Sequence, residues 1–110
     1  MKKVKRNWGY YRTLFWTPFF AVKILVFKKK GRLSLQTHEF RSELWLILSG
    51  HGYALYDQCY CNVRKNKNSF YWIPRGKQHK FRTVNEECKI LEIQFGSKVS
   101  EKDIKRYDSD

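Results

Sequence analysis

The sequence predicts an all-β fold, built as a sandwich or a small antiparallel β-barrel. Its apolar runs are short and rich in Val, Ile, Phe, Tyr and Trp, which is typical of strands rather than of an amphipathic helix. Turn-forming residues separate the runs, and successive runs start roughly 8–12 residues apart, as in sandwiches and barrels. With 42% hydrophobic residues, the 110-residue chain can bury the core of one domain.

The first three expected strands lie between the N-terminus and residue 37. Tyr10–Phe15 and Phe20–Phe27 are runs of aromatic and aliphatic residues separated at Pro18. The lysine-rich turn Lys28–Gly31 ends the second run, and Arg32–Thr37 then alternates polar and apolar residues.

The remaining strands follow in the same manner up to residue 95. A glycine-containing turn, Ser49–Gly52, and the turn Pro74–Gly76 separate some of them. A helix start is expected only at Ser100, a candidate N-cap followed by acidic residues, so a short C-terminal helical turn completes the prediction. The strands expected here are Glu43–Leu48, Gly52–Tyr56, Cys59–Val63, Ser69–Ile73, Lys77–Arg82 and Lys89–Phe95.

The chain is strongly basic and has the length of a single domain. It carries 23 Lys and Arg against 10 Asp and Glu, which gives a net charge of +13. One domain over residues 1–110 is therefore expected, rather than a two-domain enzyme. A basic excess of this size attracts nucleic acid, an anionic membrane surface or a phosphorylated small molecule, and charge alone does not choose among them.

The cysteines and the apolar N-terminal region indicate a cytoplasmic protein. Cys59, Cys61 and Cys88 are odd in number and lack the spacing of a zinc knuckle or a redox pair, so we expect reduced thiols. The basic start followed by apolar residues imitates a signal peptide, but Pro18 and Lys23 interrupt the apolar run. The same interruptions exclude a transmembrane helix, and no membrane partner is expected.

Alternation between residues 32 and 38 places polar side chains together. A period of two puts Arg32, Ser34, Gln36 and His38 on one face and Leu33, Leu35 and Thr37 on the other. The polar face is either the solvated outside of a sandwich or the wall of a polar pocket inside a barrel.

Two motifs decide between these interpretations. Gln36-x-His38-x4-Glu43-x6-Gly50, followed by Pro74-x-Gly76-x2-His79, resembles the paired signature motifs of the cupin superfamily. The resemblance implies a cupin barrel, a double-stranded β-helix or jelly roll, in which these side chains bind one divalent metal. Gln36 stands where the first motif usually has histidine, and a Gln-His-Glu-His set is the one that phosphomannose isomerases use. The implied metal ligands are Gln36, His38, Glu43 and His79.

The match extends to one cupin family along nearly the whole chain. The string from Gly31 to Trp45 looks like the C-terminal cupin domain of the type II mannose-6-phosphate isomerase and mannose-1-phosphate guanylyltransferase family. The family commonly has further histidines at the positions of Thr37, Glu39, Phe40 and Leu44, and their loss removes imidazoles that could assist proton transfer. Since a nucleotidyltransferase domain is absent, we do not expect sugar-nucleotide synthesis.

The donor set suits a borderline divalent ion. Two imidazoles, one carboxylate and one amide oxygen favour zinc, with manganese, iron, nickel or cobalt as alternatives. Four protein ligands leave one or two positions for water or substrate oxygens. His51, in a glycine-flanked turn, is expected to be a solvated loop residue.

The resemblance implies isomerisation of mannose 6-phosphate to fructose 6-phosphate. Glu92 is a candidate general base, although a surface position is an equal alternative. Arginine forks and lysine charges suit a phosphate group, and the polar face makes Arg32 the first choice among the candidates. The phosphate-binding candidates are Arg32, Arg41, Lys77 and Arg106.

Two other functions stay open at this point. A cupin that binds metal or sugar without turnover would keep the same four ligands. A basic β-barrel that binds nucleic acid would use the lysine clusters and nearby aromatic residues, although lysines in turns usually form a solvated surface. The cupin resemblance also implies a homodimer.

Overall fold

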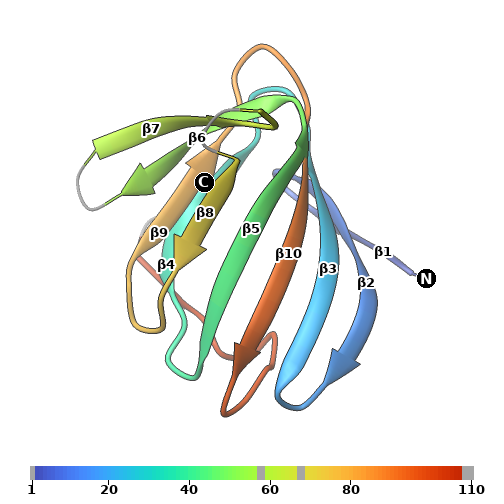
Figure 1. Ribbon diagram of the computed structural model, residues 1–110, viewed down its shortest axis with the longest axis vertical. Helices are drawn as coiled ribbons and strands as arrows, with labels where there is room; N and C mark the ends of the chain where they lie inside the picture. The colour runs from blue at the N-terminus through green and yellow to red at the C-terminus, as the bar shows by residue number, and fades with distance from the viewer. Residues whose placement is uncertain (1, 57–58, 67–68, 108–110) are drawn as a thin grey trace.

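The computed structural model describes residues 2–56, 59–66 and 69–107 of the chain, and these residues form strands without a helix (Figure 1). The nine expected strands are confirmed, with their ends shifted by a few residues. The strands are β1 Lys3–Arg6, β2 Gly9–Thr17, β3 Phe20–Phe27, β4 Arg32–Thr37, β5 Arg41–Ser49, β6 His51–Tyr56, β7 Cys59–Arg64, β8 Phe70–Ile73, β9 His79–Arg82, β10 Cys88–Gly96 and β11 Lys105–Arg106.

Two antiparallel sheets face each other across the interior, as expected for a small β-barrel. One has six strands in the order β1-β2-β3-β10-β5-β8, and the other has five in the order β11-β4-β9-β6-β7. Strand β10 lies between β3 and β5, which brings the end of the chain next to its first third (Figure 1). No described helix is long and apolar enough to cross a membrane.

The inward side chains of the six-stranded sheet change from polar to apolar along its central strands. Strands β3, β5 and β10 are paired in register, so their polar ends lie together and their apolar ends lie together. The interior therefore has a polar layer at one end and an apolar core at the other. The buried polar members are Lys23, Arg41, Glu43, Glu92 and Gln94, and the apolar ones are Leu25, Phe27, Trp45, Ile47, Cys88 and Ile90.

Aromatic rings fill the centre of the apolar core. The ring centroids of Phe27 and Phe81 lie 4.8 Å apart, and those of Trp45 and Phe81 lie 5.5 Å apart, both edge-on. Such pairs stabilise a core by about 0.5–1.5 kcal/mol each beyond the burial of their area. The polar layer therefore lies directly against a packed aromatic core.

The two motif glycines allow turns that other residues would strain. Gly50 has φ of +74°, and a Cβ there would lie 2.0 Å from the Glu87 carbonyl oxygen. Gly76 has φ of +80° in the turn between β8 and β9, and its N–H donates to the His38 carbonyl oxygen at 2.8 Å. Both glycines thus fix the connections of strands that carry site residues.

Three details differ from the sequence-based expectations. The helical turn expected at Ser100 does not form. A single hydrogen bond from the Asp103 N–H to the Ser100 carbonyl closes a turn there, and the chain then extends into β11, which pairs with β4. Strand β1 was not predicted, because its four residues are mostly charged and exposed. His51 is not a solvated loop residue, since it begins β6 and its ring contacts the Glu86 carboxylate.

A β-bulge corrects the predicted face assignment on β4. The pairing of β4 with β9 shifts register between Leu33 and Gln36, so these two side chains both point inward. The strict period of two therefore fails, and Leu33 joins Gln36 in the interior although the sequence placed them on opposite faces. The bulge is what turns Gln36 into the interior.

Candidate metal centre

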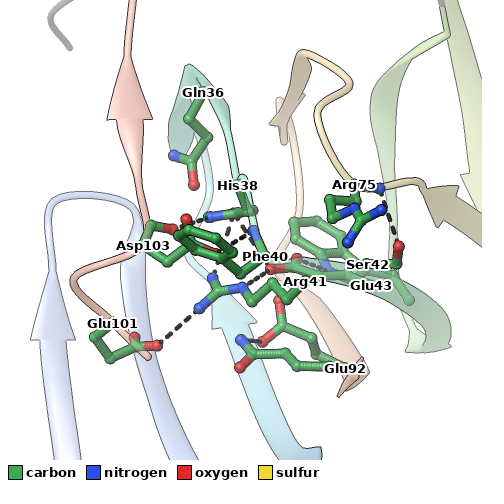
Figure 2. Close-up of polar contacts among 12 residues, drawn as sticks. Gln36, His38, Phe40, Arg41, Ser42, Glu43, Arg75, Glu92, Glu101 and Asp103 are labelled. Carbon is green, nitrogen blue, oxygen red and sulfur yellow. Dashed lines mark hydrogen bonds and ion pairs between the residues drawn. The ribbon is translucent and has the colours of Figure 1, made fainter. Parts of the chain in front are cut away.

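Three buried side chains converge in the polar layer. His38 follows β4, Glu43 lies on β5 and His79 begins β9. Their potential ligand atoms all lie within 4.8 Å of one another, and the three residues are at most 3% exposed. Figure 2 shows His38 and Glu43 side by side at this point. The spacing of these donors suits a single metal ion.

The buried ring of His79 has nitrogens that are available to bind a metal ion. Neither of its ring nitrogens has a hydrogen-bond partner, although the residue is only 1% exposed. An unpaired buried polar group is costly, and coordination of a cation by one nitrogen would remove that cost. Burial also lowers its pKa to about 4, so the imidazole is in the neutral, ligating form at neutral pH.

His38 is oriented by the C-terminal segment. Its Nδ1–H donates to the Asp103 carbonyl oxygen at 2.6 Å, which leaves Nε2 to face Glu43 at 3.2 Å. Metal-binding histidines generally donate their second N–H to a carbonyl or carboxylate in this way. Burial lowers the pKa of His38 as well, which favours the neutral ring.

Gln36 brings an amide to the same interior. It is 5% exposed, and its register partner across β4 and β9 is His79. Its Nε2 donates to the carbonyl and hydroxyl oxygens of Ser34 at 3.2 and 3.3 Å, which turns the amide oxygen away from Ser34. Figure 2 shows that oxygen directed towards His38. All four residues expected to bind metal therefore lie together, and their donor types fit a divalent ion.

Arg41 neutralises the carboxylate of the centre. Its Nε donates to Glu43 Oε2 at 2.8 Å, one Nη donates to the Ser100 carbonyl at 2.8 Å, and the other lies 3.3 Å from His38 Nε2. Burial would raise the pKa of Glu43, but Arg41 and the two histidines lower it to about 2. Arg41, one of the residues expected to bind phosphate, is buried against the candidate ligands and also lines the cavity described below.

Glu92 points inward, which resolves the alternative left by the sequence. Its carboxylate accepts the Trp45 Nε1–H at 2.8 Å and the Gln94 Nε2–H at 2.7 Å. Trp45 Nε1 also lies 3.1 Å from Glu43 Oε1, so one indole holds both carboxyl groups. Burial, and next the charge of Glu43, raise the pKa of Glu92 well above its usual range. Glu92 is thus a protonatable group beside the candidate ligands.

A cavity of about 360 Å³ opens onto these side chains and has a cationic lining. Arg32, Arg41 and Arg106, three of the four expected phosphate-binding residues, line it, whereas Lys77 lies in the turn between β8 and β9 outside the lining. Arg6 is a further cation of the lining that the sequence did not point out. The cavity can therefore hold a small anionic molecule beside the candidate metal centre.

Lys23 is the most informative residue that sequence reasoning missed. It is 4% exposed on β3, and its Nζ lies 2.6 Å from Glu101 Oε2 and 4.6 Å from the centroid of the Tyr11 ring. Buried lysines need such a partner. The available signal was a lysine at an inward position of an otherwise apolar strand, which the sequence analysis treated only as an interruption.

Of the expected thiols, Cys61 and Cys88 are free. Cys88 is buried, and burial raises its pKa to about 12. The side chain of Cys59 lies outside what the structure describes.

Comparison with known proteins identifies the family. The family described as mannose-6-phosphate isomerase C-terminal matches residues 1–109. The chain belongs to this family. The alginate biosynthesis protein AlgA of Pseudomonas putida is 32% identical over 107 residues, which are 96% of this chain and 22% of that protein. The mannose-1-phosphate guanylyltransferase of Klebsiella pneumoniae is 33% identical over 96% of this chain and 22% of its own length.

The chain thus spans less than a quarter of the length of these curated relatives. Solved structures confirm the cupin fold. Oxalate decarboxylase from Bacillus subtilis matches with a TM-score of 0.79 at 15% identity, over 96% of this chain and 29% of that one. A sugar phosphate isomerase of the cupin superfamily from Silicibacter pomeroyi matches with a TM-score of 0.62 at 15% identity, over 70% and 50% of the two chains.

The positions where the family commonly has extra histidines lie away from the cavity. None of the four residues contributes to the lining of the 360 Å³ cavity. Leu44 is on the outer face of β5, and Glu39 and Phe40 are exposed in the loop between β4 and β5. Their replacement therefore removes no group from the lining of this cavity, although Thr37, Glu39 and Phe40 line a second one beside His38. The residues concerned are Thr37, Glu39, Phe40 and Leu44.

Proposed function

We propose that this cupin is a metal-dependent sugar-phosphate isomerase that interconverts mannose 6-phosphate and fructose 6-phosphate. The observation that carries the proposal is the buried His38, Glu43 and His79 cluster with the protonatable Glu92 beside it, at the wall of a cavity lined by cations. Family membership and the guanylyltransferase relatives support chemistry on phosphorylated mannose.

The proposed reaction moves a proton between two adjacent sugar carbons. Gln36, His38, Glu43 and His79 would hold the ion, which supplies Lewis-acid stabilisation of negative charge that develops on the sugar oxygens. The Glu92 carboxylate accepts the proton from C2 as that C–H bond breaks, and the resulting carboxylic acid returns it to C1, while the proton of the O2 hydroxyl passes to O1 and leaves C2 as the carbonyl carbon. Burial raises the pKa of Glu92, which allows its acid form to hold the proton before returning it.

The cations of the lining have separate tasks in this proposal. Arg32 and Arg106 bind the phosphate from the mouth of the cavity, since guanidinium groups match phosphate oxygens. Lys23, held by Glu101, donates to a sugar hydroxyl from the opposite wall. Arg41 keeps Glu43 ionised and positions it as a ligand.

A second candidate function is a cupin that binds metal or sugar without turnover. The observation that favours it is the contact between Arg41 and His38 Nε2 at 3.3 Å. This guanidinium occupies the lone pair that an ion would need, so metal binding must displace it. A weakly bound ion would leave sugar binding without catalysis.

The experiment measures metal content and turnover on the same sample. Protein reconstituted with Zn²⁺, Mn²⁺ or Co²⁺ is assayed for conversion of mannose 6-phosphate to fructose 6-phosphate, with and without chelator. We expect metal-dependent turnover that Glu92→Gln reduces by about 10²–10⁴-fold while the metal stays bound. Stoichiometric metal without conversion in the wild type would contradict the isomerase and support the second candidate. Zinc as the metal, a homodimer and a cytoplasmic location are further parts of the proposal.

A further inference from the structure

The outer face of the five-stranded sheet carries cations and tyrosines side by side. Inward residues of β6, β7 and β9, namely Ala54, Val63 and Phe81, are fully buried, so the residues that alternate with them point outward. Figure 1 shows these strands on the opposite side of the molecule from β2 and β3. We call the outward set the basic-aromatic face, and its members are Tyr53, Leu55, Tyr60, Asn62, Arg64, Lys80 and Arg82.

Arg82 lies between the two tyrosine rings of this face. Its Cζ is 5.5 Å from the centroid of the Tyr53 ring and 5.4 Å from that of the Tyr60 ring. Tyr53 is its register partner on β6, and Tyr60 comes from β7, so three strands contribute to the cluster. Arg82 is exposed, and Tyr60 is 45% exposed. The contacts thus hold a planar guanidinium and a ring surface at the solvent, where a flat ligand can stack.

The basic-aromatic face is positively charged. Its seven residues include Arg64, Lys80 and Arg82 but no carboxylate. Among the residues that the structure describes, Glu86 lies at the margin of the face, where it contacts His51. A polyanion would therefore meet attraction without direct repulsion from this face. The other described acidic residues are in the interior or in segments outside these three strands: Glu39, Glu43, Glu87, Glu92, Glu101 and Asp103.

The mixture of charge and ring surface narrows the class of polyanion. A nucleic-acid duplex keeps its bases paired and stacked, so it would contact the cations and leave the tyrosine rings unused. A membrane surface favours large apolar side chains that can insert, and Leu55, the aliphatic member of the face, is half-buried. Unpaired bases, by contrast, stack on aromatic rings and guanidinium planes while basic side chains contact the phosphates.

The geometry of the sheet suits a short single strand. Strands β4, β9, β6 and β7 lie side by side, and at about 4.8 Å between neighbours they span roughly 14 Å. Four-stranded sheets that bind RNA stack two or three bases on their aromatic residues. The cations of this face also lie on strands, unlike the lysine-rich turns considered from the sequence, so the sheet register fixes their positions.

We propose that the basic-aromatic face binds single-stranded nucleic acid, with bases stacked at Tyr60 and Arg82 and phosphates held by Arg64 and Lys80. None of these four residues lines the cavity beside the candidate metal centre, so the site is separate from that of the proposed isomerase and does not depend on turnover. The proposal also accounts for part of the +13 charge that the cavity does not use.

Fluorescence anisotropy with labelled oligo(dT) and oligo(rU) of about twelve nucleotides tests the proposal on the full chain. Both probes should bind about tenfold more tightly than a duplex of the same length, although the duplex carries more charge. Tyr60→Ala should weaken binding about tenfold, because a stacking surface is lost. Trp72→Ala is the matched control, since it removes an aromatic side chain of similar exposure, 46%, from the other sheet, and it should bind as the wild type. Tighter binding of oligo(rU) than of oligo(dT) would name RNA as the ligand, and the reverse would name DNA.

A second pair of variants separates this site from general attraction. Arg82→Ala and Lys89→Ala each remove one positive charge, but Lys89 lies on β10, in the other sheet. Arg82→Ala should weaken binding about tenfold and reduce the slope of log affinity against log salt by about 0.7, the value for one phosphate contact of a single strand. Lys89→Ala should leave both unchanged. Arg82→Lys keeps the charge and loses the planar group, so it should restore the slope but not the affinity.

Three outcomes would overturn the proposal. They are duplex binding as tight as single-strand binding, equal losses in Arg82→Ala and Lys89→Ala, and full affinity in Tyr60→Ala. Circular dichroism checks that each variant is folded, and if Tyr60→Ala is not, Arg82→Lys carries the stacking test, in which an unchanged affinity contradicts the proposal. Binding to phosphatidylserine vesicles that Arg82→Ala abolishes, without binding to either oligonucleotide, would assign the face to a membrane instead.

Discussion

Burial of ionisable residues makes the metal-free protein sensitive to acid. His79 has its pKa lowered from 6.5 to about 4 in the folded protein, and Glu43 from 4.5 to about 2. Both groups therefore bind protons more readily in the unfolded chain, so their contributions to stability are complete above pH 6.5 and are lost between pH 6.5 and 2. Glu92 has a raised pKa and acts in the opposite sense, since its ionisation above pH 4.5 disfavours the folded state.

We predict that the Tm of chelator-treated protein falls as the pH is lowered from 6.5 to 4. The physical reason is that burial disfavours the protonated, charged ring of His79 in the folded protein and so lowers its pKa. The measurement is the Tm by circular dichroism at constant ionic strength. His79→Phe should flatten the curve in this window, and an equally steep curve for that variant would contradict the assignment.

Two basic residues of the chain should differ in their effect on phosphate binding. Arg106 lines the cavity, whereas Lys77 lies outside the lining, so we predict that Arg106→Ala weakens mannose 6-phosphate binding about tenfold and Lys77→Ala leaves it unchanged. Isothermal titration measures both. Equal losses in the two variants would show that the phosphate binds elsewhere or only through general attraction.

The C-terminal segment is the element that completes the site. The Asp103 carboxylate accepts the N–H groups of Glu39 and Phe40 at 2.8 and 2.9 Å, and its backbone carbonyl orients His38. A segment more than 60 residues away in sequence thus fixes the loop between β4 and β5.

We predict that Asp103→Ala lowers the free energy of unfolding by about 1–2 kcal/mol, because two backbone donors lose their acceptor. Metal affinity should fall as well, by about 10–100-fold, as His38 loses its fixed orientation. Denaturant unfolding and metal titration measure the two effects. Lys102→Ala in the same segment is the control. Undiminished metal affinity in Asp103→Ala would show that the segment does not position His38.

The elements differ in how far the sequence could predict them. Alternating and apolar runs were sufficient for nine strands, because enough inward residues in each strand are hydrophobic to reveal it, even where Lys23, Arg41 and Glu92 also point inward. The bulge on β4 could not be predicted, since it depends on pairing with β9, and it turned Leu33 to the same side as Gln36. Strand β11 and the turn at Ser100 depend likewise on pairing with β4 rather than on local preference.

Across the whole molecule, the spaced motifs were sufficient to point out the candidate ligands but not the residues that pair with them. Gln36, His38, Glu43 and His79 could be found because their spacing is fixed by strands and turns of set length. The ion pairs could not be predicted in this way. Arg41 pairs with Glu43 because both side chains point into the interior. Lys23 pairs with Glu101 because the C-terminal segment passes close to β3.

The net charge of +13 should steer anionic substrates to the molecule. We predict that the apparent KM for mannose 6-phosphate rises as NaCl is increased from about 0.01 to 0.15 M, because the screening length falls from about 30 to 8 Å. The kcat should change little. Uncharged mannose provides the control in binding experiments, and an equal salt dependence for it would contradict electrostatic steering.

The central claim is that the buried polar layer is a metal centre, and metal stoichiometry tests it most directly. Inductively coupled plasma mass spectrometry of protein reconstituted with Zn²⁺ and then desalted should give one ion per chain for the wild type. His79→Ala should give close to none, and His51→Ala, which alters a histidine outside the layer, should match the wild type. A wild type that retains no ion, or a His79→Ala variant that retains a full equivalent, would contradict the claim.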